Sequence, residues 1–112
     1  MSVVEQLKTF VDKVNRYPDR IQNEKDRVFQ FDLTNKATIQ IEQLKEGKAF
    51  LVEDGQKDAD VTLKLSEHHL QKLLVDELNP TMAFMTGQLK VSGKIGLAIK
   101  LQELVRTYQE LA

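Results

Sequence analysis

The chain of 112 residues has no cysteine, which excludes disulfides, zinc-thiolate sites and thiol nucleophiles together. It also lacks the run of about 18 apolar residues that a membrane span needs, and its N-terminus has no secretory pattern. We therefore expect a soluble protein of the cytoplasm. The length is close to the commonest size of one compact domain, so a single domain over residues 1–112 is predicted.

A strong charge of either sign is absent as well. The 16 Lys and Arg residues nearly balance 17 Asp and Glu residues, so no summed field draws the molecule to nucleic acid. From Thr81 onward there is a mild positive excess: Lys90, Lys94, Lys100 and Arg106 against Glu103 and Glu110. This excess would suit transient contact with an anionic membrane surface, although an ordinary solvated surface explains it more simply.

Amphipathic helices are predicted at both ends of the chain. Ser2 and Glu5 form a capping box, and Pro18 ends the helix that follows it. The last helix begins after Gly93 and has a broad apolar arc, with Ile95 and Ile99 outside that arc among polar residues.

Between these helices, apolar and polar residues alternate with a period of two, which is typical of strands. Strands are predicted over residues 27–33, 37–42, 49–52, 61–65 and 89–92. Ser66 caps a middle helix, and Asn79-Pro80 begins a short apolar turn at residues 82–85. The order helix, four strands, helix, strand, helix predicts an α+β fold with helices over one face of a sheet.

The adjacent His68 and His69 are the side chains best suited to a metal or to acid–base chemistry. On a helix, however, they point about 100° apart, and no third ligand is placed by spacing. We expect solvated histidines here. The sequence predicts no catalytic residue, no metal site and no cofactor, and so no enzyme.

The second half of the chain carries several short motifs in a fixed order. They are Asp60-Val-Thr-Leu-Lys-Leu-Ser66, Leu78-Asn-Pro80, Ala83-Phe-Met85, Gly87, Leu89-Lys-Val91, Gly93, Ile95 and Ala98-Ile-Lys-Leu101. Together they resemble the signature of the sterol carrier protein type 2 family, and a looser likeness reaches back to Arg27. Any single motif would be weak, but matches in order over about forty residues are unlike chance.

The resemblance implies a five-stranded, mostly antiparallel sheet covered on one face by helices, with an internal apolar tunnel. It implies non-catalytic binding and transfer of fatty acids, fatty acyl-CoA, sterols or phospholipids. The tunnel lining that it implies is Phe84, Met85, Leu89, Leu97, Leu101 and Leu104, to which alternation adds Phe31, Leu33, Ile39, Ile41 and Phe50. Arg16 or Arg20 is hypothesised to meet a lipid carboxylate or phosphate, the alternative being that both only solvate a helix end.

One departure from the family concerns location. The chain ends Glu110-Leu111-Ala112 without the peroxisomal address of many relatives, which favours the cytoplasm. A freestanding monomer is expected.

Two other functions stay open. One is a protein-interaction or scaffold domain with a collapsed tunnel and a docking patch at Ile95 and Ile99. The other is an accessory domain that presents a lipid-like substrate to an enzyme. Apolar volume alone does not distinguish a sterol from a fatty acyl ligand.

Overall fold

Five strands form one mixed sheet in the order β3-β2-β1-β4-β5. The computed structural model describes residues 2–18, 25–34, 38–44 and 47–110. The strands are β1 (Arg27–Leu33), β2 (Thr38–Leu44), β3 (Lys48–Glu53), β4 (Val61–Leu65) and β5 (Lys90–Gly93). Neighbouring strands are antiparallel except β1 and β4, which are parallel. The mostly antiparallel α+β sheet predicted from the sequence is confirmed, and the parallel pair is an addition to it.

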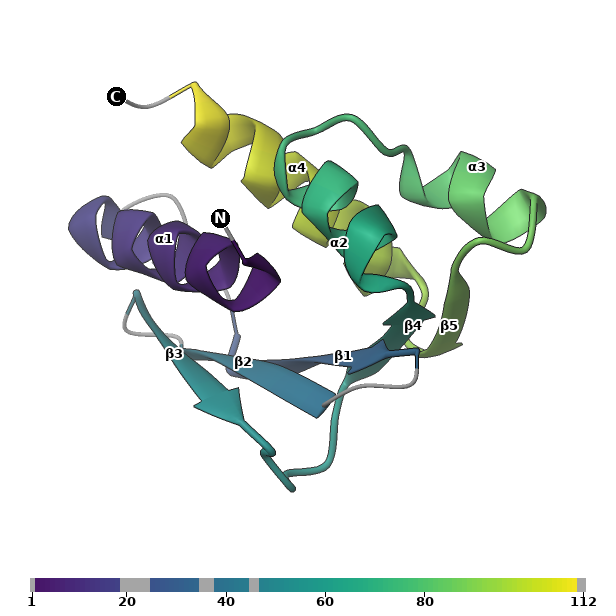
Figure 1. Ribbon diagram of the computed structural model, residues 1–112. Helices are drawn as coiled ribbons and strands as arrows, with labels where there is room; N and C mark the ends of the chain where they lie inside the picture. Colours follow the sequence, from purple (N-terminus) through teal and green to yellow (C-terminus); the bar gives the residue numbers. More distant parts are fainter. Residues whose placement is uncertain (1, 19–24, 35–37, 45–46, 111–112) are drawn as a thin grey trace.

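Helices cover one face of this sheet (Figure 1). They are α1 (Val3–Arg16), α2 (Glu67–Leu74), α3 (Pro80–Met85) and α4 (Gly96–Gln109). The predicted apolar turn is the short helix α3, whose N-cap is Asn79. The Asn79 Oδ1 accepts hydrogen bonds from the backbone N–H groups of Thr81 and Met82 at 2.9 and 3.2 Å. Such caps satisfy donors that have no partner within the helix.

Serine caps begin α1 and α2, as the sequence predicts. The Ser2 hydroxyl accepts from the Glu5 N–H at 3.2 Å, and the Ser66 hydroxyl accepts from the His69 N–H at 3.1 Å. Each cap fixes where an amphipathic helix starts, and the apolar arc of the helix determines which of its faces is buried.

The inner face of the sheet is apolar because every second residue of its central strands points toward the helices. Phe29 and Phe31 of β1 lie opposite Ile41 and Ile39 of β2, and all four are buried. On the other side of β1, β4 contributes the buried side chains of Val61, Leu63 and Leu65.

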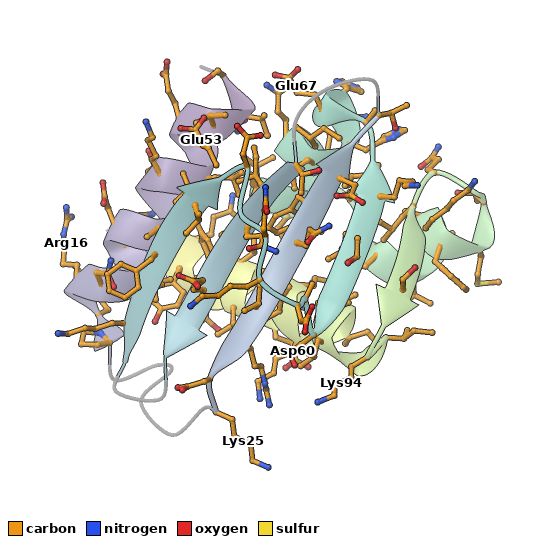
Figure 2. The ribbon with its side chains drawn as sticks, turned by 90° about the horizontal axis from the view of Figure 1, so that it is seen from below. Arg16, Lys25, Glu53, Asp60, Glu67 and Lys94 are labelled. Atoms are coloured by element: carbon orange, nitrogen blue, oxygen red, sulfur yellow. The ribbon has the colours of Figure 1, made fainter. Side chains whose placement is uncertain are left out.

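The outer face is polar, and the connection from β3 to β4 crosses it (Figure 2). Gln40 is only 1% exposed because this connection covers it. Its Nε2 donates to the Lys57 carbonyl at 2.7 Å and to the Gln30 Oε1 at 2.8 Å. Gly55 leaves the space that Gln40 needs, since a Cβ at this position would collide with the amide. The connection thereby carries the chain from one sheet edge to the far side of β1.

Candidate functional site

The space between the sheet and the helices is apolar and almost filled. A void of about 10 Å³ lies there. It is bordered by Phe10 and Val14 of α1, Phe29, Ile41 and Ala49 of the sheet, and Leu101 and Leu104 of α4. A single water needs about 10–15 Å³, whereas ligand pockets measure roughly 300–1,000 Å³. The void among the described residues is therefore far smaller than the tunnel that the resemblance implies.

Most of the predicted lining residues nevertheless meet in this interior. Those that the structure buries are Phe31, Leu33, Ile39, Ile41, Leu89, Leu97 and Leu101. Leu104 is partly buried against them and borders the void. Sheet and α4 thus bring these side chains into one apolar cluster, and their contact with lipid stays a prediction.

Phe50 does not join them, and the prediction for its position is wrong. It pairs with Glu42 on the outer face of the sheet and is 47% exposed, whereas Ala49 is buried on the inner face. The physical reason is that residues 49–52 are all apolar. Such a run carries no alternation from which the inward residues can be identified.

Phe84 and Met85 also lie outside the interior, contrary to their predicted place in its lining. They are 48% and 75% exposed, because Pro80 and Ala83 occupy the buried side of α3. Phe84 instead borders a separate apolar pocket of about 130 Å³. The other residues around it are Pro80, Thr81, Val91, Ile95, Ala98 and Ile99.

The arginines predicted to meet a head group are not brought to the void. Arg16 is exposed in the last turn of α1, and its side chain points away from the sheet (Figure 2). Arg20 lies outside the described residues. One turn earlier on α1, the Lys13 Nζ donates to the Tyr108 carbonyl at 3.3 Å and so lies beside the end of α4.

Lys13 belongs to an open groove of about 230 Å³ between α1, the end of α2 and the end of α4. Its lining is Gln6, Thr9, Phe10, Lys13, Leu74, Val75, Val105, Tyr108 and Gln109. Phe10 borders both the groove and the interior void, so this residue lies where the two spaces adjoin. The ring packs edge-to-face against Tyr108, with centroids 5.9 Å apart.

An ion pair joins α4 to the segment after α2. The Arg106 Nε is 3.0 Å from the Asp76 Oδ2, and this hydrogen bond raises the pKa of Arg106.

His68 is exposed and His69 half-buried, with ring centroids 5.9 Å apart. Among the described residues, no group of three or more His, Asp or Glu is placed to hold a metal ion. No helix in the described ranges is both long and apolar enough to cross a bilayer.

The sequence over residues 4–106 matches the model of the SCP-2 sterol transfer family. The chain belongs to this family. Sterol carrier protein 2 of Rattus norvegicus is 38% identical over 69 residues, which are 62% of this chain and 13% of the rat protein. This SCP-2 family chain therefore spans a small part of the curated relatives that it matches.

Solved structures share the fold of the SCP-2 family chain. The sterol carrier protein domain 2 of Helicoverpa armigera superposes with a TM-score of 0.74 at 26% identity, covering 98% of this chain and 90% of that one. Palmitated SCP2L2 from Aedes aegypti gives a TM-score of 0.70 at 21% identity, covering 94% and 95%. Family membership supports lipid binding and transfer in general.

Sequence reasoning missed the contribution of α1 to the site of this SCP-2 family chain. Phe10 falls among the apolar residues of the first helix and Tyr108 among those of the last, but neither is in the predicted lining. Both residues lie well inside the apolar arcs of their helices. This position is the signal from which a contact between the two helices could have been predicted. Lys13 gave no signal, because a lysine on an amphipathic helix is ordinary.

Proposed function

We propose that residues 1–112 form one domain that binds a single lipid with a long acyl chain and transfers it without catalysing a reaction. The observation that carries the proposal is the apolar void between α1, α4 and the sheet, separated from an open groove by Phe10. Family membership supports it, as does the palmitated state of the Aedes aegypti relative. The ligand classes proposed are fatty acid, fatty acyl-CoA, sterol and phospholipid.

Binding requires the interior to expand, since the void is far smaller than an acyl chain. Rotation of the Phe10 ring would join the void to the groove, and outward movement of α1 and α4 would supply the remaining volume. Each methylene transferred from water to an apolar site contributes about 0.8 kcal/mol. A chain that buries about ten methylenes gains roughly 8 kcal/mol in this way. This gain offsets the free energy that is lost when side chains of the packed interior separate.

We propose Lys13 as the contact for a lipid carboxylate at the mouth of the site. Its ammonium group lies beside the end of α4, and Lys13 and Phe10 both line the groove. Hydrogen bonds between charged partners are about twice as strong as neutral ones. Arg16 lies one turn further along α1 and is exposed, so it suits a larger head group that extends into solvent.

A second candidate is a protein-interaction domain whose interior is permanent core. The filled interior favours it, as do Ile95, the N-cap of α4, and Ile99 within α4, which are 52% and 45% exposed. Such a domain would dock a partner through α4 and would bind no lipid.

Titration of delipidated protein with a fluorescent fatty acid separates the two functions. A carrier shows saturable binding near one ligand per chain at low-micromolar concentration, and native mass spectrometry shows the matching gain in mass. Folded, delipidated protein that shows neither would overturn the carrier proposal in favour of the interaction domain.

A further inference from the structure

The strand β5 (Lys90–Gly93) forms one edge of the sheet. It pairs with β4 on one side, and in the described part of the chain no strand pairs with its other side. In an antiparallel pair, every second residue of an edge strand directs its N–H and C=O groups away from the partner strand. This edge therefore offers backbone donors and acceptors to a further strand.

The face of β5 toward the helices borders an apolar pocket. Val91 lies opposite the buried Leu63, and it lines this pocket of about 130 Å³. Its other walls belong to α3 and to the start of α4, where Phe84, Ile95 and Ile99 are each about half exposed. Small-molecule sites measure roughly 300–1,000 Å³, so a pocket of this size suits a single apolar side chain instead.

The outer face of β5 is positively charged. Lys90 lies opposite Lys64 of β4, and both lysines are exposed. Neither of them forms an ion pair with another described residue. Asp32 of β1 lies on the other side of Lys64, whereas no described strand lies beyond Lys90. Like charges directly opposite each other destabilise a sheet, and an acidic residue next to Lys90 would relieve this repulsion.

We propose that β5 pairs with an extended segment of a partner protein in which acidic and apolar residues alternate. A strand added at this edge would lie about 4.8 Å from β5, and its side chains would point alternately to the two faces of the sheet. An apolar residue would enter the pocket beside Val91, and the acidic residues before and after it would lie on the outer face with Lys90 and Ser92.

The position of α3 fits this arrangement. In both views α3 extends beyond β5 on the side away from β4, so it would cover the added strand from the helix side (Figure 1, Figure 2). Backbone hydrogen bonds supply affinity when a peptide joins the edge of a sheet, and pockets for alternate side chains supply specificity. The open edge of β5 and the pocket beside Val91 provide one of each.

The distribution of charge and apolar surface favours a strand over other partners. A flat membrane meets one side of a molecule, whereas Lys90 and the pocket lie on opposite faces of the sheet. A second copy that paired through its own β5 would add lysines to an edge that is already positive. A lysine on a short edge strand ordinarily prevents such self-pairing. This protection does not act against an acidic strand, and it leaves the pocket beside Val91 unexplained.

Fluorescence anisotropy with labelled synthetic peptides tests the edge of the full chain. The probe is Thr-Glu-Ile-Glu-Val-Glu-Thr, and its control, Thr-Glu-Glu-Glu-Ile-Val-Thr, has the same composition without the alternation. The probe should bind saturably and at least about tenfold more tightly than the control, because only the probe places its acidic and apolar side chains on opposite faces. N-methylation of two successive central residues removes an N–H that faces β5 and should abolish binding.

Variants of the protein test the two faces separately. Ile99→Ser removes part of the pocket wall and should weaken binding of the probe by about tenfold, since an apolar contact is lost. Lys90→Glu should weaken it by about two- to fivefold and should strengthen binding of a peptide with lysine in place of each glutamate. Phe50→Ser and Lys48→Glu on β3, the opposite edge strand, are the matched controls and should bind the probe like wild type.

Amide hydrogen exchange locates the bound peptide. Protection should increase in β5 and stay the same in β3. The inference is overturned by folded wild type that shows no saturable binding, by equal binding of probe and control peptide, or by protection that appears in β3 instead. It is also overturned if the protein forms a dimer that protects β5 without peptide in analytical ultracentrifugation and exchange, because a second copy then occupies the edge.

Fatty acid titration of the same variants keeps this inference distinct from the proposed function. The pocket beside β5 shares no lining residue with the interior void or the groove, so Ile99→Ser and Lys90→Glu should bind fatty acid like wild type. Wild type that binds fatty acid but not the probe would contradict the strand site alone. Wild type that binds the probe but no fatty acid would contradict the carrier function alone.

Discussion

The hydroxyl of Tyr108 donates a hydrogen bond of 2.9 Å to the backbone carbonyl of Tyr17. It joins the last turn of α4 to the residue that ends α1, so the two helices that border the interior void are tied at one end. The ring of Tyr108 is 1% exposed and also packs against Phe10. One buried side chain therefore fixes both the spacing of these helices and the position of the ring between groove and void.

Tyr108→Phe removes this hydrogen bond and keeps the ring. We expect the free energy of unfolding to fall by about 1 kcal/mol, since a typical intramolecular hydrogen bond contributes that much. Stopped-flow mixing with a fluorescent fatty acid should show faster association, because α1 and α4 separate more readily. Unchanged association in a destabilised variant would mean that the ligand does not enter between these helices.

Phe10→Ala joins the groove to the interior void. Removal of a buried Phe side chain destabilises a protein by about 3–5 kcal/mol, and because Phe10 is partly buried we expect a loss near the lower end of that range. Fatty acid association should become faster while the denaturant midpoint falls. Phe50→Ala is the matched control, and it should alter neither quantity because Phe50 lies on the outer face.

Lys13→Ala tests the carboxylate contact. Fatty acid affinity should fall by about fivefold, which corresponds to about 1 kcal/mol for a charge-assisted hydrogen bond in a partly open groove. Affinity for a sterol should stay the same, because a sterol has no carboxylate. Lys8→Ala removes an exposed lysine from the same helix and serves as the control. Equal losses for both ligands would show that Lys13 acts through packing instead.

Gly55→Ala forces a methyl group against the Gln40 amide and should destabilise the protein by about 1–3 kcal/mol. In a Gln40→Ala background the same substitution should have a much smaller effect, since the collision is gone. A double-mutant cycle of urea unfolding measures this coupling. Lipid affinity should not change in either single variant that folds, because the contact lies on the outer face of the sheet. Additive effects would contradict the packing described for the crossover.

Local signals were sufficient to predict most elements of the fold. Ser66 and Asn79-Pro80 mark where helices begin. The Ser and Asn side chains accept hydrogen bonds from backbone N–H groups of the first turn, and the proline ring fixes a helical backbone angle. The parallel pairing of β1 with β4 has no comparable signal. This pairing depends on the path of residues 54–60 across the sheet, which the hydrogen bond from Gln40 to Lys57 holds in place. From the sequence alone, Gln40 is expected to be an ordinary exposed residue of a strand.

The candidate site also has one part that the sequence predicts and another part that it does not. The buried positions on β1, β2 and α4 follow from clear alternation and a clear helical arc, and the structure places them together. Phe50 lies in a run of apolar residues without alternation, so the sequence does not indicate toward which face of the sheet its side chain points. Phe84 and Met85 depend on how α3 is rotated, which is decided by the burial of Pro80 and Ala83. The contact between Phe10 and Tyr108 joins opposite ends of the sequence, where no local pattern relates them.

The crossover beneath the sheet determines which wall of the interior is able to move. Gln40 binds the connection at Lys57 through a hydrogen bond on the outer face of the sheet, and it also binds Gln30 of β1. The outer side of β1 and β2 is therefore covered by this connection, in addition to the hydrogen bonds that pair the two strands. Among the described residues, no segment crosses the outer side of the helix layer in this way, and α1 and α4 meet each other through side chains such as Tyr108. If the chain carries lipid as proposed, we expect the space for the ligand to come from displacement of the helices while the sheet keeps its position. In amide hydrogen exchange, ligand loading would alter the protection of α1 and α4 while β1 and β2 keep theirs.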